Sequence, residues 1–336
     1  MAAESSKFVV YAAAAGNLLV AITKFIAAWW TGSAAMASEA IHSLVDTGNQ
    51  AVLLYGIHRA EQPPDETHPL GYGRELYFWS FIVALLMFSL GAGLSFYEGV
   101  VHLRHPVEIR NPEVSYIVLA CAAIFEGCTW TIAFRQFRSS KGRFGYFEAM
   151  RRSKDPPSFI VLFEDSAAIL GLAIAFIGTF SAQMFSMPRL DGAASVAISI
   201  LLALTALALA RESKNLLIGE PASRELRRAI LSIVRSADGI DDAQLVLTVH
   251  LAPDQVVAIL GVDFHDKLTV PEVEAVTRSL EHSIRDAHPE VIAIFIRPHA
   301  AAASGQMPPV GTPTRKLLGK LSDRSREISS SSVRAK

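Results

Sequence analysis

Six apolar segments, each long enough to cross a lipid bilayer, follow one another in the first two thirds of the chain. A transmembrane helix needs about 20 predominantly apolar residues, and a chain that is 51% hydrophobic and 19% charged supplies them. In hydrocarbon each segment must satisfy its own backbone hydrogen bonds, which selects the helix. We therefore predict an α-helical membrane protein with six transmembrane helices, at residues 8–30, 35–57, 77–101, 113–134, 159–181 and 190–210.

The loop between the fourth and fifth segments fixes the expected orientation. Residues 135–157 are rich in Lys and Arg, and basic loops stay in the cytoplasm. Both termini are then cytoplasmic. No cleavable signal peptide or organelle-type presequence is evident, which favours a bacterial inner (plasma) membrane. The basic residues of this loop are Arg135, Arg138, Lys141, Arg143, Arg151, Arg152 and Lys154.

The composition changes after residue 212, which ends the predicted transmembrane domain (1–212). Helical and strand patterns then follow in the order αββαβ, as residues 222–237, 244–251, 256–264, 270–286 and 291–297. Thr269 and Glu272 have the spacing of a capping box at the second helix. We predict a cytoplasmic α+β domain of ferredoxin-like type over 213–300. The Ala-, Ser-, Pro- and Arg-rich residues 301–336 are expected to be disordered.

Ionisable residues inside the predicted spans indicate a metal site. His42 and Asp46 are four residues apart, on one face of the second helix, and each costs roughly 2.5–3.5 kcal/mol at membrane depth. Asp165 and its neighbour Glu164 lie in the fifth span. Nitrogen and oxygen ligands from two helices suit Zn²⁺ or a similar ion. The alternative is that these groups only join helices by hydrogen bonds, but buried carboxylates repel one another unless protonated or metal-bound.

The fourth span carries two further features. Glu126, near its middle, is expected either to relay protons or to bridge helices, and the residue pattern leaves both open. Cys121 and Cys128 are two helical turns apart, and we predict a buried pair of small apolar side chains.

Two continuous motifs resemble one family, the cation diffusion facilitators. Residues 38–50, SEAIHSLVDTGNQ, resemble the family's second-span signature, and residues 64–74, PDETHPLGYGR, resemble its cytoplasmic connection. Six spans followed by a small cytoplasmic domain match the family layout. The run at residues 63–79 is most similar to the zinc transporter 9-like branch. The resemblance implies a homodimeric secondary transporter that exports a divalent metal, commonly zinc, in exchange for protons.

The resemblance also assigns ligands to the transport site. His42 and Asp46 match the second-span ligands, and Asp165 matches the acid of the fifth span. The family's other fifth-span ligand would lie where this chain has Val161. Glu164 is the candidate substitute, although it lies about 100° around the helix from Asp165.

A second, weaker family site is implied in the loop after the second span. Asp65 and His68 match its ligands, but Tyr72 stands where a third ligand is expected, and tyrosine is a poor zinc ligand at neutral pH. The alternative is a Pro-flanked turn that packs on the basic loop.

The resemblance is least complete in the cytoplasmic domain. Family members that bind metal at the dimer interface carry His-x-Asp before a terminal proline, and here Phe295 and Arg297 occupy those positions. Asp263 and His265 share one face of a strand and could form a ligand pair. We predict dimer contact, without a binuclear metal site, as the role of this domain.

The predicted function is therefore export of divalent metal cations, most of all Zn²⁺, from the cytoplasm by proton antiport. Departures at Val161, Tyr72 and Phe295 keep open a non-transporting membrane metal-binding regulator or scaffold of the same fold. An intramembrane metalloenzyme is disfavoured because no His-Glu-x-x-His run occurs, so the chain is predicted not to be an enzyme. Its expected partners are the metal, protons, the lipid bilayer and a second copy, with no organic cofactor and no nucleic acid.

Overall fold

The computed structural model describes residues 2–109, 111–140, 145, 154 and 156–298. Within them the chain divides into two compact units, one formed by residues up to Glu220 with His250–Gln255, the other by Pro221–Val249 and the residues from Val256 on. The predicted domain boundary after residue 212 falls inside the last helix of the first unit. The tail predicted at 301–336 and the basic-loop residues Lys141, Arg143, Arg151 and Arg152 lie outside the described residues.

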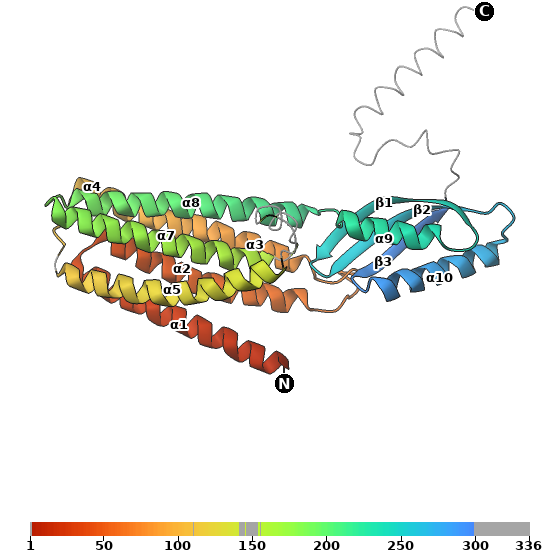
Figure 1. The fold of residues 1–336 in the computed structure, drawn as a ribbon, viewed down its shortest axis with the longest axis horizontal. Helices are drawn as coiled ribbons and strands as arrows, with labels where there is room; N and C mark the ends of the chain where they lie inside the picture. The colour runs from red at the N-terminus through yellow and green to blue at the C-terminus, as the bar shows by residue number, and fades with distance from the viewer. Residues whose placement is uncertain (1, 110, 141–144, 146–153, 155, 299–336) are drawn as a thin grey trace, which may run out of the picture. The chain divides into compact units, whose positions relative to one another are not determined.

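The first unit is a bundle of long helices that lie side by side (Figure 1). The third predicted span is one continuous helical rod made of α3, the π-helical turn η1 and α4. The elements are α1 (Ala2–Thr31), α2 (Ala34–Ala60), α3 (Glu75–Leu86), η1 (Met87–Ala92), α4 (Gly93–Arg104), α5 (Pro112–Ser140), α7 (Pro156–Met184) and α8 (Arg189–Ile218).

Four helices of the described chain are apolar and long enough to cross a membrane. They are Glu75–Arg104, Pro112–Arg135, Phe159–Met184 and Arg189–Ile218, so the protein is a helical membrane-type protein. In α1 the described apolar part, Asn17–Thr31, is shorter. α2 has 27 residues, but Glu39, His42 and Asp46 make it more polar than the other long helices.

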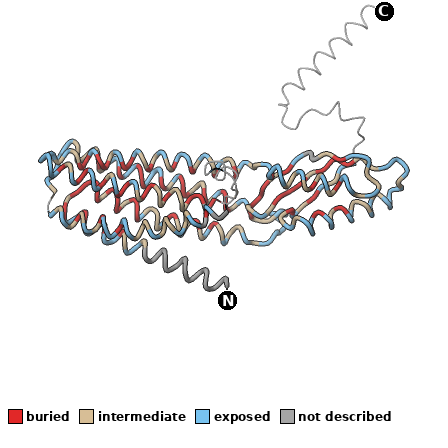
Figure 2. Tube along the Cα trace, viewed as in Figure 1, coloured by how far each residue is buried: buried red, intermediate tan, exposed pale blue. Residues whose placement is uncertain are grey.

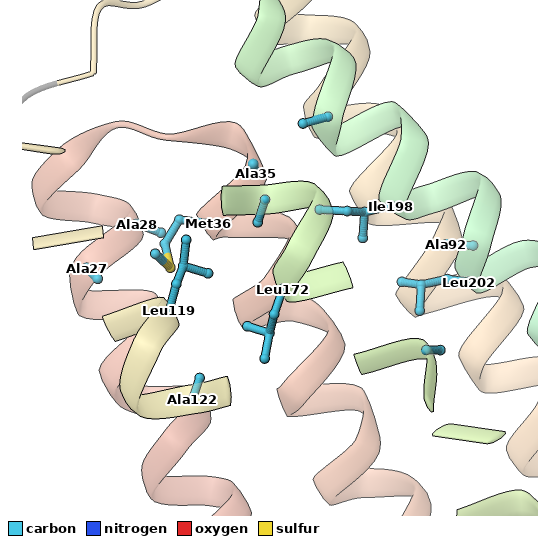
Figure 3. Packing of buried hydrophobic residues seen from close by; sticks show 13 residues of the cluster. Ala27, Ala28, Ala35, Met36, Ala92, Leu119, Ala122, Leu172, Ile198 and Leu202 are labelled. Atoms are coloured by element: carbon cyan, nitrogen blue, oxygen red, sulfur yellow. The ribbon is translucent and has the colours of Figure 1, made fainter. Parts of the chain in front are cut away.

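Small side chains let the helices of the bundle approach closely. One buried cluster joins α1, α2, α5, α7 and α8 with Ala92 at the end of η1, and eight of its thirteen residues are alanines (Figure 3). A Cβ added to Gly99 of α4 would come within 2.8 Å of Val196 in α8. Buried and exposed stretches alternate along these helices (Figure 2), and many large apolar side chains of the bundle are exposed. Such an outer surface suits contact with lipid.

The prediction that Cys121 and Cys128 are buried is wrong. Both are free and exposed, on the same outward face of α5 as Ile124 and Ile132. The physical reason is that α5 turns its polar face, which includes Glu126, into the bundle.

The second unit contains a small three-stranded sheet with two helices. Alternate residues Ala258, Leu260 and Val262 form one core with apolar residues of both helices, among them Ile230 and Leu280. The strand order is β1-β2-β3, and β2 and β3 are parallel. The elements follow as α9 (Arg224–Arg235), β1 (Ile240–Ala252), β2 (Gln255–Phe264), α10 (Val270–Ala287) and β3 (Val291–Pro298).

The predicted capping box at the start of α10 is confirmed. The backbone N–H of Thr269 donates to Glu272 Oε2 at 2.7 Å, and the reciprocal contact is also present. These hydrogen bonds, from the backbone N–H and then the hydroxyl of Thr269, hold the pKa of the Glu272 carboxyl below its ordinary value.

Candidate functional site

The start of α2 is fixed by a carboxylate from α8. Gly32, with φ +72°, forms the turn from α1, and the Ser33 hydroxyl accepts from the backbone N–H of Met36 at 3.1 Å. Asp191 Oδ1 accepts from Ser33 Oγ at 2.8 Å and from Thr179 Oγ1 at 3.2 Å. Asp191 Oδ2 accepts from the backbone N–H groups of Ala34, at 2.5 Å, and Ala35, at 3.2 Å. A fixed first turn sets which face of α2 points into the bundle.

His42 and Asp46 lie one turn apart on that face. Their Nδ1 and Oδ1 atoms are 3.4 Å apart, as the spacing of four residues predicts. Neither ring nitrogen of His42 nor Oδ1 of Asp46 has a hydrogen-bond partner, although all three atoms are buried. Buried polar atoms are normally paired, so this stretch of α2 carries unused ligand capacity.

The two acids of α7 differ in their surroundings. Glu164 Oε1 accepts a hydrogen bond from Asn49 Nδ2 at 2.9 Å. Asp165 Oδ2 is buried without a partner. Asn49, which the sequence does not single out as a ligand, thus holds Glu164 against α2.

One cavity of about 450 Å³ gathers all three predicted transport-site acids. Asp46, Glu164 and Asp165 all line it, and so do Val161 and the α5 residue Glu126. Val161 therefore stands at the cavity itself, where the family resemblance expects a ligand. His42 is adjacent to this wall but is not part of it. Across the described residues, no three His, Cys, Asp or Glu side chains are close enough together to hold an ion as they stand.

A charged network that the sequence analysis missed borders this cavity. Lys24 of α1 is completely buried, and its Nζ lies 3.2 Å from Glu39 Oε2 and 3.1 Å from Glu126 Oε1. Of the two roles considered for Glu126, bridging between helices is the one this contact describes. The sequence signals of this network are Glu126 and a lysine within an apolar span, where lysines commonly reach the membrane surface instead.

The loop site has the same residue types in a different state. Asp65 Oδ1 accepts from the backbone N–H of His68 at 2.7 Å and from both the N–H and the hydroxyl of Thr67, while Oδ2 accepts from the Tyr72 hydroxyl at 2.7 Å. These bonds, that of Tyr72 foremost, hold the pKa of Asp65 well below its usual range. The carboxylate closes its own turn, so a metal ion would have to displace these donors.

Comparison with known proteins places the helical unit in a family. The profile of the cation efflux transmembrane domain matches residues 10–218. The chain is 32% identical to the mitochondrial proton-coupled zinc antiporter SLC30A9 of Homo sapiens over 262 residues, which is 77% of this chain and 46% of that protein. It is 30% identical to metal tolerance protein C4 of Arabidopsis thaliana, over 76% of this chain and 56% of the relative.

A bacterial relative is covered more completely. The chain is 27% identical to the cation-efflux pump FieF of Escherichia fergusonii over 280 residues, which is 83% of this chain and 87% of the relative. By contrast, the chain spans less than half of the length of SLC30A9. By their names, the zinc antiporter and the efflux pump are transporters, not enzymes.

Proposed function

We propose, from the premise that this chain belongs to the cation efflux family, that it exports a divalent metal cation, Zn²⁺ above all, from the cytoplasm in exchange for protons. The names of its relatives support both the metal and the proton coupling. The 32% identity with the zinc antiporter, over 77% of this chain, supports the zinc transporter 9-like branch, to which residues 63–79 are also most similar.

The observation that carries this proposal is the set of buried ligand atoms without partners. They are the ring nitrogens of His42, Asp46 Oδ1 and Asp165 Oδ2, beside or inside one cavity in a membrane-type bundle. Polar atoms at membrane depth without partners are costly and mark ion pathways. A dication supplies the missing partner and offsets the carboxylate charges.

Transport follows from competition for the same atoms. Deprotonated carboxylates and a neutral imidazole bind the metal on the cytoplasmic side. When the bundle opens to the other side, protons compete for these groups and the ion leaves. Histidine suits this exchange because its ordinary pKa lies near physiological pH.

We propose His42, Asp46 and Asp165 as the main ligands and Glu164 as the fourth. Glu164 is the fourth ligand because Val161 offers no ligand atom. Its Oε1 accepts a hydrogen bond from Asn49 Nδ2, which holds the side chain at the cavity. The second site at Asp65 and His68 is proposed only as a weak site that transport does not need, since the Asp65 oxygens already accept hydrogen bonds.

We also propose how the chain is arranged in the membrane and how its sheet unit pairs. α1 and α2 complete six spans with the four apolar helices, and both termini face the cytoplasm of a bacterial inner membrane. The sheet unit is a ferredoxin-like domain that pairs with a second copy, supported by the exposed apolar side chains of Leu247 and Phe295. Contact with lipid is supported by the outward-facing apolar residues of the bundle.

The test is metal flux into proteoliposomes that contain the purified full chain and a zinc-sensitive dye. An imposed pH gradient should drive zinc uptake, and collapsing the gradient with an ionophore should stop it. The variant Asp165→Asn should lose this uptake while Asp65→Asn keeps it. Zinc binding without flux would favour the regulator or scaffold and overturn the proposal.

A further inference from the structure

Lys24 lies at the centre of a charge network inside the helical bundle. Its ammonium group donates to Ser43 Oγ at 2.7 Å and pairs with Glu39 of α2 and Glu126 of α5. A buried cation is tolerated only when it is paired and hydrogen-bonded. Lys24 therefore ties three helices together through one fixed positive charge.

This network is directly beside the proposed ion cavity. Ser43 and Glu126, both bonded to Lys24, line the cavity together with Asp46 and Asp165. Ser43, which accepts from the ammonium group, directly follows His42 in α2 and lies three residues before Asp46. Any dication in the cavity thus meets the field of Lys24.

We propose that Lys24 is a positioning residue that weakens divalent-cation binding in this cavity and thereby permits release. It holds the Glu126 carboxylate away from the ion and repels the ion with its own charge. The inference rests on the proposed function. An ion pathway works only if binding is strong enough for entry and weak enough for exit.

The network explains why a lysine is present among acids that serve a cation. All three N–H groups of the Lys24 ammonium have acceptors, whereas Glu39 keeps one oxygen, Oε1, buried without a partner. A residue that only pinned the helices could bury a neutral hydrogen-bonding group at lower cost. A fixed positive charge also repels the metal ion, which a neutral hydrogen-bonding group would not do.

Four variants separate charge from structure. Lys24→Met removes the charge, Lys24→Arg keeps it, Glu126→Gln removes the paired carboxylate, and the double variant Lys24→Met/Glu126→Gln removes both. Zinc affinity is measured on the purified full chain in nanodiscs by competition with a fluorescent chelator. Turnover is measured as initial zinc flux in proteoliposomes, and folding is checked by size-exclusion chromatography and thermal melting.

Lys24→Met and Glu126→Gln are expected to change zinc affinity in opposite directions. Lys24→Met should tighten zinc binding by about tenfold and lower turnover, since one unit charge near a dication is worth at least that in a partly buried site. Glu126→Gln should weaken binding by about tenfold, and the double variant should return close to the wild-type affinity. Lys24→Arg should bind and transport like the wild type.

If Lys24→Met binds zinc as tightly as the wild type or more weakly, the inference is overturned. A lysine that only holds the helices together would give that result. If Lys24→Met does not fold, the double variant decides: it must bind zinc more tightly than Glu126→Gln, and equal binding overturns the inference. A wild-type protein that binds no zinc overturns both the inference and the proposed function. If the wild-type flux is normal but the Lys24 and Glu126 variants do not change zinc affinity as expected, only the inference is overturned.

Discussion

Two histidine–aspartate pairs, one within α2 and one in the loop that follows it, are in opposite states. His42 and Asp46 are four residues apart within α2, and Asp65 and His68 are three residues apart in the following loop. The side chain of His42 is 1% exposed and that of His68 is 53% exposed. In α2, both ring nitrogens of His42 and Oδ1 of Asp46 lack hydrogen-bond partners. In the loop, both oxygens of Asp65 accept hydrogen bonds from residues of the same loop.

The difference teaches that residue type and spacing alone do not define a metal site. A carboxylate whose lone pairs are already used by protein donors gains little from an ion, because the ion must first break those bonds. A buried carboxylate without donors gains a great deal. Unused hydrogen-bonding capacity in a cavity is thus the better criterion.

The largest expected effect on zinc flux comes from a substitution in the cavity, and the matched substitution in the loop should have almost none. Asp46→Asn should reduce zinc flux by on the order of 100-fold, because it removes a charged ligand atom. Asp65→Asn, the matched change in the loop, should keep flux within about twofold of the wild type. Both are measured as initial rates in proteoliposomes at equal protein content. Equal losses in the two variants would refute the comparison.

The sequence predicts the helices well and their partners poorly. Apolar length alone places a helix on each of the six predicted segments, and the Thr269–Glu272 spacing predicts the observed capping box. The pairing of Lys24 with Glu126 joins residues far apart in sequence. Such contacts depend on how each helix is rotated in the bundle, which apolar periodicity in a nearly uniformly apolar segment does not encode.

A different reason explains the error at Cys121 and Cys128, because the polar residues of α5 do distinguish its two faces. In a soluble helix the apolar face is buried, but in a bilayer the most apolar face of α5 points outward and the polar face points in. The sequence pattern gives the two faces of the helix, and the surrounding solvent decides which of them is inside.

Asp191 provides the next test, because it is a buried acid whose oxygens are both used. Asp191→Ala would leave the Ser33 hydroxyl and the N–H groups of Ala34 and Ala35 without their acceptor. We expect a loss of about 2–3 kcal/mol in the free energy of unfolding, from buried donors left unpaired. Reversible denaturation in mixed micelles measures this loss.

Zinc affinity separates this structural acid from the transport acids. The folded fraction of Asp191→Ala should bind zinc within about threefold of the wild type, since the carboxylate has no capacity left for an ion. Asp165→Asn should show the reverse, with little loss of stability and a large loss of affinity. Wild-type stability in Asp191→Ala would contradict the role assigned to the cap.

A smaller effect, on the pKa of Asp65, is expected when its hydrogen-bond donor Tyr72 is replaced. Tyr72→Phe removes the hydrogen bond that contributes most to the low pKa of Asp65, so this pKa should rise toward its ordinary value. Because the folded-state pKa is depressed, the carboxylate stabilises the loop above its unfolded pKa of about 3.9, and this contribution is lost as pH falls through the folded-state value. The turn is therefore expected to stay formed at neutral pH.

Nuclear magnetic resonance of aspartate labelled with ¹³C at the carboxyl carbon follows this titration. The Asp65 signal is identified by its loss in Asp65→Asn. A titration midpoint that does not move in Tyr72→Phe would show that the Tyr72 hydroxyl does not hold the carboxylate.

The smallest effect is expected at His68. Its Nδ1 lies 2.9 Å from Thr67 Oγ1 and its ring lies 4.2 Å from that of Tyr72, so the side chain packs within its own exposed turn. His68→Ala should therefore change zinc flux and zinc affinity by less than about twofold, because exposed contacts of this kind contribute little. The matched variant in the cavity is His42→Ala, which should lose most flux. A loss at His68 as large as that at His42 would mean that the loop binds transported metal despite its filled hydrogen bonds.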